Sequence, residues 1–164
     1  MATFGKENIG GTTRTNIATD VTVCKYTLGE GGVVSNISIY INCTVAGLVK
    51  ACIYSDVAGV PTVLTGVSDA VNVGVAAAWV DFPCNISLSA GDWWLGWLSD
   101  QETSYWYDAG AANQRSYDSG NAYPNFPAPF VASGYQARAI SIHADYTPSA
   151  GGQQLFTLIN EEDY

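Results

Sequence analysis

The stretch Val33-Val-Ser-Asn-Ile-Ser-Ile-Tyr-Ile-Asn-Cys43 alternates apolar and polar residues through most of its length. Successive side chains of a β-strand point to opposite faces of the sheet, so Ile37, Ile39 and Ile41 share one face with the cysteine. The polar residues between them share the opposite face. The stretch therefore predicts a long strand with one face in a hydrophobic core and the other in solvent.

Similar alternation of apolar and polar residues recurs along most of the chain, and turns containing Gly or Asp separate most of these alternating stretches. The further predicted strands are residues 21–28, 48–55, 61–67, 79–88, 93–99, 104–108 and 138–146. No segment has the pattern of an amphipathic helix. About eight antiparallel strands predict an all-β jelly-roll β-sandwich over residues 21–147. Residues 1–20 are then expected as an N-terminal arm and residues 148–164 as an acidic C-terminal arm.

Charge and hydropathy limit the classes of partner. The 164 residues carry a formal net charge of −9, and only 13% of them are charged. A chain this acidic repels phosphate backbones, so we expect no nucleic-acid partner. No apolar stretch is long enough to span a membrane, so no membrane partner is expected either. The first residues lack the pattern of a signal peptide, which favours release in a virion over secretion.

The four cysteines leave several arrangements open. The segments Cys24-Lys-Tyr-Thr-Leu28 and Cys84-Asn-Ile-Ser-Leu88 resemble each other, and each precedes a Gly-containing turn and an apolar strand. If these two strands are neighbours, Cys24 and Cys84 can meet and form a disulfide. Cys43 and Cys52 flank a short turn, but the alternation places their side chains on different faces, so this bridge is less favoured. Alternatively, all four are buried thiols.

Residues with catalytic or metal-binding chemistry are sparse. His143 is the only histidine of the chain, and the pattern of its strand places it on the outer face. No Ser/His/Asp or Cys/His arrangement follows from the sequence, and no Cys-x-x-Cys, His pair or calcium-loop signature occurs. Aspartates in turns suit calcium, but they suit turn formation equally well. We therefore expect no enzyme, no metal site and no cofactor.

Aromatic residues give the strongest functional signal. In the strand 93–99, Trp93 and Trp97 face the opposite side from Trp94, so one set is expected to leave the core. Exposed rings stack on sugars while neighbouring polar groups bind hydroxyls. The candidate ligand-binding residues are Tyr105, Trp106, Tyr107, Asp108, Asn113, Gln114, Arg115 and Tyr117. Alternatively, the rings fill the core and a subunit interface.

Two segments outside the regular strands also suggest function. Residues 109–135 are rich in Gly, Asn, Ser, Pro and Tyr, as is typical of a long functional loop. The last segment carries apolar residues that water would poorly accommodate, and it is expected to dock on a neighbouring subunit as an assembly arm. These residues are Leu155, Phe156, Leu158 and Ile159.

The chain resembles jelly-roll modules that occur in phage structural proteins and are appended to secreted, polysaccharide-associated bacterial proteins. The resemblance is carried by Gly31-Gly-Val-Val-Ser-Asn-Ile-Ser-Ile-Tyr40, Val49-Lys-Ala-Cys-Ile-Tyr-Ser-Asp56, Trp79-Val-Asp-Phe82, Leu88-Ser-Ala-Gly-Asp-Trp-Trp-Leu95, Tyr105-Trp-Tyr-Asp-Ala-Gly110 and Ile140-Ser-Ile-His-Ala-Asp-Tyr146. It implies the sandwich fold and leaves function open between two classes.

The preferred interpretation is a non-catalytic virion structural protein. It would be a capsid decoration or tail-associated jelly roll that assembles with copies of itself and other virion proteins. The alternative is an extracellular carbohydrate-binding module that recognises cell-surface glycans through exposed aromatic residues.

Overall fold

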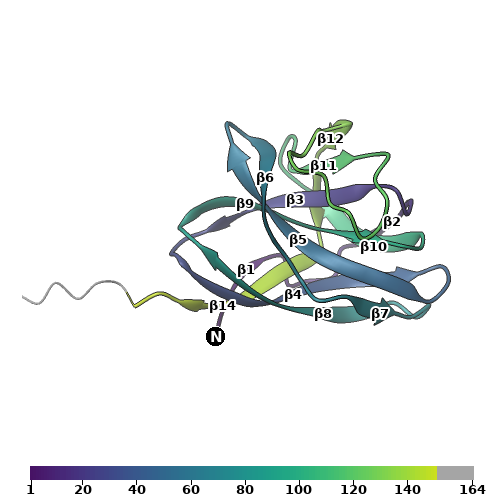
Figure 1. The fold of residues 1–164 in the computed structure, drawn as a ribbon, viewed down its shortest axis with the longest axis horizontal. Helices are drawn as coiled ribbons and strands as arrows, with labels where there is room; N and C mark the ends of the chain where they lie inside the picture. The colour runs from purple at the N-terminus through teal and green to yellow at the C-terminus, as the bar shows by residue number, and fades with distance from the viewer. Residues whose placement is uncertain (151–164) are drawn as a thin grey trace, which may run out of the picture.

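Two antiparallel β-sheets face each other in the computed structural model, which describes residues 1–150 (Figure 1). Sheet A contains β1 (Ala2–Gly5), β2 (Thr12–Asn16), β4 (Gly32–Cys43), β8 (Ala78–Leu88), β10 (Thr103–Ala109), β13 (Arg138–Ile140) and β14 (Ile142–Pro148). Sheet B contains β3 (Val21–Leu28), β5 (Gly47–Val57), β6 (Val60–Val67), β7 (Val71–Val73), β9 (Gly91–Ser99), β11 (Arg115–Asp118) and β12 (Gly134–Gln136). The predicted all-β sandwich is confirmed.

Connections between strands cross repeatedly from one sheet to the other. In sheet A the strand order is β1-β14-β4-β10-β13, with β8 paired to β4 and β2 paired to β10. In sheet B the order is β12-β11-β3-β9-β5-β6, with β7 paired to β5. Over residues 1–150 the chain forms no helix long and apolar enough to cross a membrane.

Every strand predicted from alternation is present, except that residues 138–146 form two strands, β13 and β14, which pair with different neighbours. Five short strands were not predicted: β1, β2, β7, β11 and β12. Two of these lie in the segment expected as an N-terminal arm. β1 pairs with β14 and β2 pairs with β10, so residues 1–20 contribute to sheet A. Phe4 anchors β1 because its side chain lies in the core between the sheets. The expected assembly arm, with Leu155, Phe156, Leu158 and Ile159, lies outside the described residues.

The main hydrophobic core fills the space between the sheets. From β4 it receives Ile37, Ile39 and Ile41, all fully buried, as the alternation predicts. Sheet B contributes Trp97, whose ring meets that of Tyr105 from sheet A at a centroid distance of 5.4 Å. Burying side chains of this size is the largest favourable contribution to folding.

A second core lies on the outer face of sheet B, beneath the segment 119–133. It contains Val21, Val23, Cys52, Tyr54, Trp94, Leu98 and Phe130. The rings of Tyr54 and Phe130 meet at 5.1 Å, and the Tyr54 hydroxyl donates a hydrogen bond to the carbonyl of Pro127 at 2.7 Å. Sheet B is therefore covered on both faces. The expectation that one set of tryptophans leaves the core is wrong, because Trp94 and Trp97 are both fully buried, each in its own core.

The disulfide predictions are corrected by the sheet order. Cys24 lies on β3 of sheet B and Cys84 on β8 of sheet A, so the two similar segments are not neighbouring strands. Cys43 lies in the main core and Cys52 in the second core, on the far side of sheet B. All four cysteines are free thiols. Likeness of sequence between two strands does not determine which sheet each one joins.

Burial also lowers the reactivity of these thiols. It raises the pKa of the Cys24 thiol to about 11, and burial assisted by Asp69 raises the pKa of Cys84 to about 11. Burial raises the pKa of Cys52 well above its ordinary value. Because the thiolate is the nucleophile, we expect iodoacetamide at about pH 8 to label the folded protein slowly, and only at the half-exposed Cys84.

Unfolding in guanidinium without reductant is expected to allow labelling of all four thiols, as measured by intact mass. Labelling of only two cysteines in guanidinium, rising to four after reduction, would show that a bridge exists.

Candidate functional site

The residues predicted to bind a ligand do not form one site. On β10, Tyr105 and Tyr107 point between the sheets, and Tyr105 is fully buried in the main core. Trp106 lies between them in sequence and points outward from sheet A. The alternation of the strand forces this separation. Trp106 is therefore the one aromatic residue of the predicted group that β10 presents on the outer face.

Three polar residues of the predicted group stabilise loops. Asp108 accepts a hydrogen bond from the Gly11 amide at 2.8 Å and contacts the Lys6 ammonium at 2.7 Å; these contacts lower the pKa of its carboxyl. Gln114 accepts from the Ala111 amide at 2.9 Å, and Asn113 occupies a left-handed turn with φ of 58°. These contacts fix the path of the chain.

The outer face of sheet A carries a line of four rings, here called the aromatic row: Trp106, Tyr40, Trp79 and His143. The four residues come from β10, β4, β8 and β14 respectively. Neighbouring centroids are 5.0 Å, 5.6 Å and 5.0 Å apart in that order, and each pair meets edge to face. All four rings are half-buried. Tyr40 reaches this face because it lies between two inward-facing isoleucines, and it is directly opposite Trp79 in the sheet.

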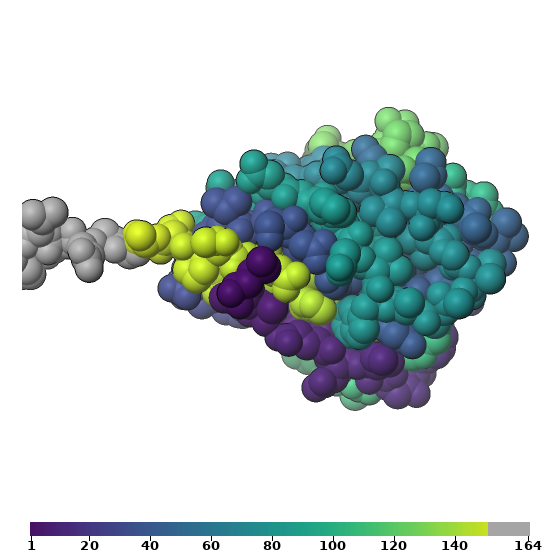
Figure 2. Space-filling view, turned by 90° about the horizontal axis from the view of Figure 1, so that it is seen from below, coloured from purple at the N-terminus to yellow at the C-terminus, as the bar shows by residue number. Residues whose placement is uncertain are grey.

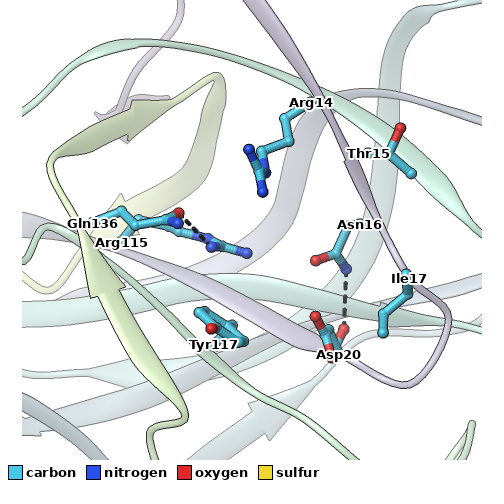
Figure 3. Close-up of a pocket in the computed structure, with 8 residues that line it drawn as sticks. All are labelled: Arg14, Thr15, Asn16, Ile17, Asp20, Arg115, Tyr117 and Gln136. Atoms are coloured by element: carbon cyan, nitrogen blue, oxygen red, sulfur yellow. Dashed lines mark hydrogen bonds between the residues drawn. The ribbon is translucent and has the colours of Figure 1, made fainter.

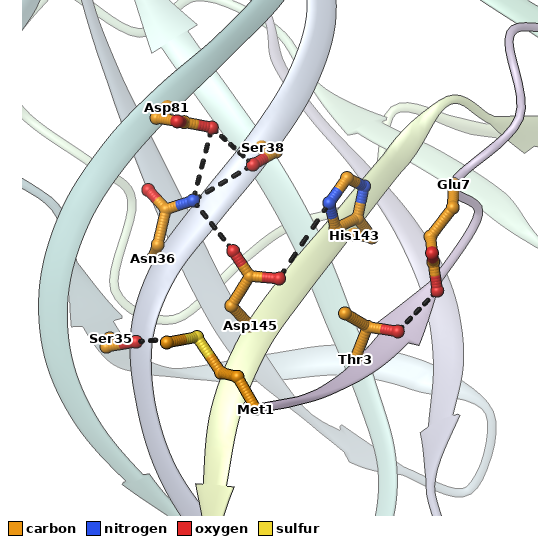
Figure 4. Close-up of polar contacts among 9 residues, drawn as sticks. All are labelled: Met1, Thr3, Glu7, Ser35, Asn36, Ser38, Asp81, His143 and Asp145. Carbon is orange, nitrogen blue, oxygen red and sulfur yellow. Dashed lines mark hydrogen bonds and ion pairs between the residues drawn. The ribbon is translucent and has the colours of Figure 1, made fainter.

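A group of hydrogen-bonded side chains, here called the polar cluster, lies beside the His143 end of this row (Figure 4). It consists of Asn36, Ser38, Asp81 and Asp145. The Asn36 amide nitrogen donates to Ser38 Oγ at 2.9 Å, to Asp145 Oδ2 at 3.1 Å and to Asp81 Oδ1 at 3.2 Å. Ser38 Oγ donates to Asp81 Oδ1 at 2.6 Å. His143 Nε2 lies 3.9 Å from Asp145 Oδ1, so the aromatic row and the polar cluster are continuous.

The outer face of sheet A is formed by side chains of its paired strands. The view from below shows β14 beside β1 (Figure 2); β4 pairs with the other edge of β14, and β8 follows beyond β4. Ser38 and His143 are directly opposite each other in the sheet, but the Ser38 hydroxyl donates to Asp81. Among residues 1–150 no group of three or more His, Cys, Asp or Glu side chains is placed to hold a metal ion. The expectation of no catalytic activity stays a prediction.

A separate pocket of about 190 Å³ lies where β2 of sheet A approaches β11 and β12 of sheet B. It is called the arginine pocket and is lined by Arg14, Thr15, Asn16, Ile17, Asp20, Arg115, Tyr117 and Gln136 (Figure 3). Arg115 and Tyr117, two of the predicted ligand-binding residues, meet here with the guanidinium 4.6 Å from the ring centroid. No sequence pattern pointed to Arg14 or Asp20, because the chain brings them beside β11 only when it folds.

Polar atoms without partners concentrate in these two places. Among residues 1–150, five buried side-chain nitrogen or oxygen atoms lack a hydrogen-bond partner. Asn36 Oδ1, Asn42 Oδ1 and His143 Nδ1 belong to the outer face of sheet A, and Asp20 Oδ1 and Arg115 Nε belong to residues of the arginine pocket. Buried polar groups are nearly always satisfied, and exceptions often mark functional sites. Both places are therefore candidate sites.

Comparisons with solved structures give matches in the sandwich fold. Cwp84, a Clostridial cysteine protease solved after propeptide cleavage, matches with a TM-score of 0.63 and 12% identity over 89% of this chain and 40% of that chain. A structure of the cysteine protease and lectin-like domains of Cwp84, a surface layer associated protein of Clostridium difficile, matches with a TM-score of 0.60 and 11% identity. That match covers 84% of this chain and 36% of the other, so this chain spans well under half of either.

No protein-family model and no curated protein sequence matches the chain. At identities of 11–12% the two structural matches show the fold, a β-sandwich shared with part of Cwp84.

Proposed function

We propose that the protein is a non-catalytic carbohydrate-binding module and that glycans bind to the outer face of sheet A. The observation that carries this proposal is the aromatic row beside the polar cluster. Sugar rings have an apolar face that stacks on aromatic side chains and hydroxyls that need directional hydrogen bonds. The outer face supplies both kinds of group side by side.

The arrangement is also fixed before any ligand binds. The residues of the aromatic row and the polar cluster lie on paired strands, which hold side chains more rigidly than loops do. The two N–H groups of the Asn36 amide, shared among three acceptors, orient both Asp81 and Asp145. Preorganisation of this kind reduces the entropy lost on binding and so favours affinity.

The structural comparison supports the same class of function. Cwp84 is described as having lectin-like domains and as surface layer associated. We take the lectin-like part as the counterpart of this all-β chain, and we propose an extracellular or cell-surface location. The apolar residues within 155–159, one ground for the assembly function predicted from the sequence, lie outside the described residues, and no described contact favours that function.

A glycan array with the full chain tests the proposal, and binding to at least one class of glycan is expected. Trp106→Ala removes one end of the aromatic row and is expected to lower affinity about fivefold, since loss of one stacked ring costs on the order of 1 kcal/mol. Asp81→Ala is expected to lower affinity similarly, because it removes the acceptor shared by Ser38 and Asn36.

The matched control is Trp93→Ala. Trp93 is half-buried on sheet B, where its indole donates to the Ser89 carbonyl at 2.9 Å, and it is not part of the outer face of sheet A. Trp93→Ala is expected to keep wild-type affinity. The proposal is rejected if the wild-type chain binds no glycan, or if Trp106→Ala and Trp93→Ala bind equally well.

A further inference from the structure

Arg115 is a buried cation that forms no ion pair with any described carboxylate. The residue is 5% exposed, and among residues 1–150 no carboxylate oxygen lies within 4.0 Å of its guanidinium. Nη1 donates to Gln136 Oε1 at 2.5 Å and Nη2 donates to Thr22 Oγ1 at 3.0 Å. Arginine has five N–H donors, so most of its hydrogen-bonding capacity is unused, and Nε is buried without a partner.

Such an arrangement is costly in a protein without a ligand. A buried charge loses its hydration, and proteins normally offset that loss with an opposite charge. Burial lowers the pKa of Arg115 and the nearby Arg138 lowers it further, while interactions with Tyr105 and Asp20 offset only part of this shift. The aromatic rings of Tyr117 and Tyr105, at 4.6 Å and 5.7 Å, provide only partial compensation.

The surroundings of Arg115 add a second positive charge. Arg14 lines the same pocket, and the two guanidinium groups point into the same space (Figure 3). The chain has only six Lys and Arg residues against fifteen acids, so two arginines in one pocket are a local reversal of the overall charge. A positive pocket on a negative protein focuses the field on an anionic ligand.

The other side of the pocket offers acceptors. Asp20 lines it, and its Oδ1 atom is buried without a partner. Asn16 is held by a hydrogen bond from its amide nitrogen to the Asp20 carbonyl at 3.1 Å and by one that its Oδ1 accepts from Thr22 Oγ1 at 2.6 Å. A ligand with an anionic group to contact the arginines and a hydroxyl to donate to Asp20 gives hydrogen-bond partners to Arg115 and to Asp20 Oδ1.

We propose that the arginine pocket binds the carboxylate of a single acidic sugar unit, a hexuronate, with Arg14 and Arg115 on the carboxylate and Asp20 accepting a hydrogen bond from a ring hydroxyl. This inference rests on the proposed glycan-binding function for the kind of ligand, but it uses none of the residues of the outer-face site.

Charge and size select the monoanionic sugar. Two guanidinium groups and the Asp20 carboxylate leave one net positive charge, which matches one carboxylate better than a dianionic phosphate. The planar guanidinium also matches the planar carboxylate. A volume of about 190 Å³ is below the range of drug-sized sites and suits one monosaccharide.

Titration of the ¹⁵N-labelled full chain with D-glucuronate or D-galacturonate, followed by NMR, tests this proposal. The Arg115 Nε–H signal is expected to shift with at least one of the two. Arg14→Gln, a change at an exposed residue, is expected to weaken that uronate's binding about tenfold or more. Lys50→Gln makes the same change in net charge on β5, outside the pocket, and is expected to leave binding unchanged.

Several outcomes overturn the proposal. The proposal fails if neither uronate binds, or if glucuronate binds no more tightly than its neutral amide. It also fails if phosphate binds as tightly as uronate, or if Arg14→Gln does not weaken binding. Trp106→Ala separates the two sites. If Trp106→Ala abolishes glycan binding on the array while uronate still shifts the Arg115 Nε–H signal, both proposed sites are supported. If the wild-type chain binds no glycan on the array but binds a uronate, only the outer-face site is rejected.

Discussion

Trp94→Ala is expected to lower the free energy of unfolding by about 3–5 kcal/mol, the usual cost of removing a large buried aromatic side chain. Trp94 is fully buried in the second core, under the segment 119–133. Its indole nitrogen also donates a hydrogen bond to Asp56 Oδ1 at 2.8 Å, and alanine leaves that contact unmade. Guanidinium unfolding followed by circular dichroism measures the loss.

The neighbouring Trp93→Ala variant is the control for this prediction. Trp93 is half-exposed and packs only partly against the main core, so its removal leaves a smaller cavity and a smaller loss of stability. Equal losses for the two variants would mean that the segment 119–133 does not bury Trp94. Phe130→Ala removes the ring of segment 119–133 that packs against Tyr54, and it is also expected to lower the free energy of unfolding.

Gly96→Ala is expected to cost about 3 kcal/mol or more, at or above the upper end of ordinary overpacking. Gly96 lies on β9, between β3 and β5 in the middle of sheet B. An added Cβ would lie 2.0 Å from the Thr22 carbonyl oxygen and 2.6 Å from Val23 Cγ1. The backbone of β3 has no room to withdraw, because β11 pairs with its other edge.

Gly29→Ala is the matched control, since a Cβ at this turn would meet no atom within 4 Å. Its free energy of unfolding is expected to stay within about 0.5 kcal/mol of the wild-type value. Thermal or guanidinium unfolding of the two variants measures the difference. A Gly96→Ala protein as stable as Gly29→Ala would contradict the close approach of β3 and β9.

The sequence predicted the parts of the fold that local alternation encodes. The burial of Ile37, Ile39 and Ile41 follows directly from a period of two. The second core did not follow, because the apolar residues that cover sheet B, such as Phe126 and Phe130, lie in a segment without periodicity. One face of β9 would be exposed if the protein had a single core, but the segment 119–133 packs on Trp94 and buries that face in a second core.

The candidate sites, like the second core, could be predicted from the sequence only in part. Clustered aromatic residues in the sequence point to Trp106, and the structure places it in the aromatic row. Its neighbours Tyr40 and Trp79 come from strands distant in sequence, and only the pairing of β4 with β8 and β10 brings the three together. Sequence alternation tells which face a side chain takes, but not which strands lie beside it.

Within residues 1–150, sheet B has a hydrophobic core on each of its faces, whereas sheet A has one on its inner face alone, so the two sheets tolerate substitutions differently. Substitutions on the outer face of sheet B alter a hydrophobic core, so most of them carry a penalty in stability. On sheet A, outward positions alternate with core positions along each strand, and residues such as Thr13, Ser104 and Asn85 can be exchanged with little effect on the isoleucines behind them. Selection in the laboratory for new specificity would therefore be most productive on sheet A, where stability and recognition depend on different side chains of the same strands.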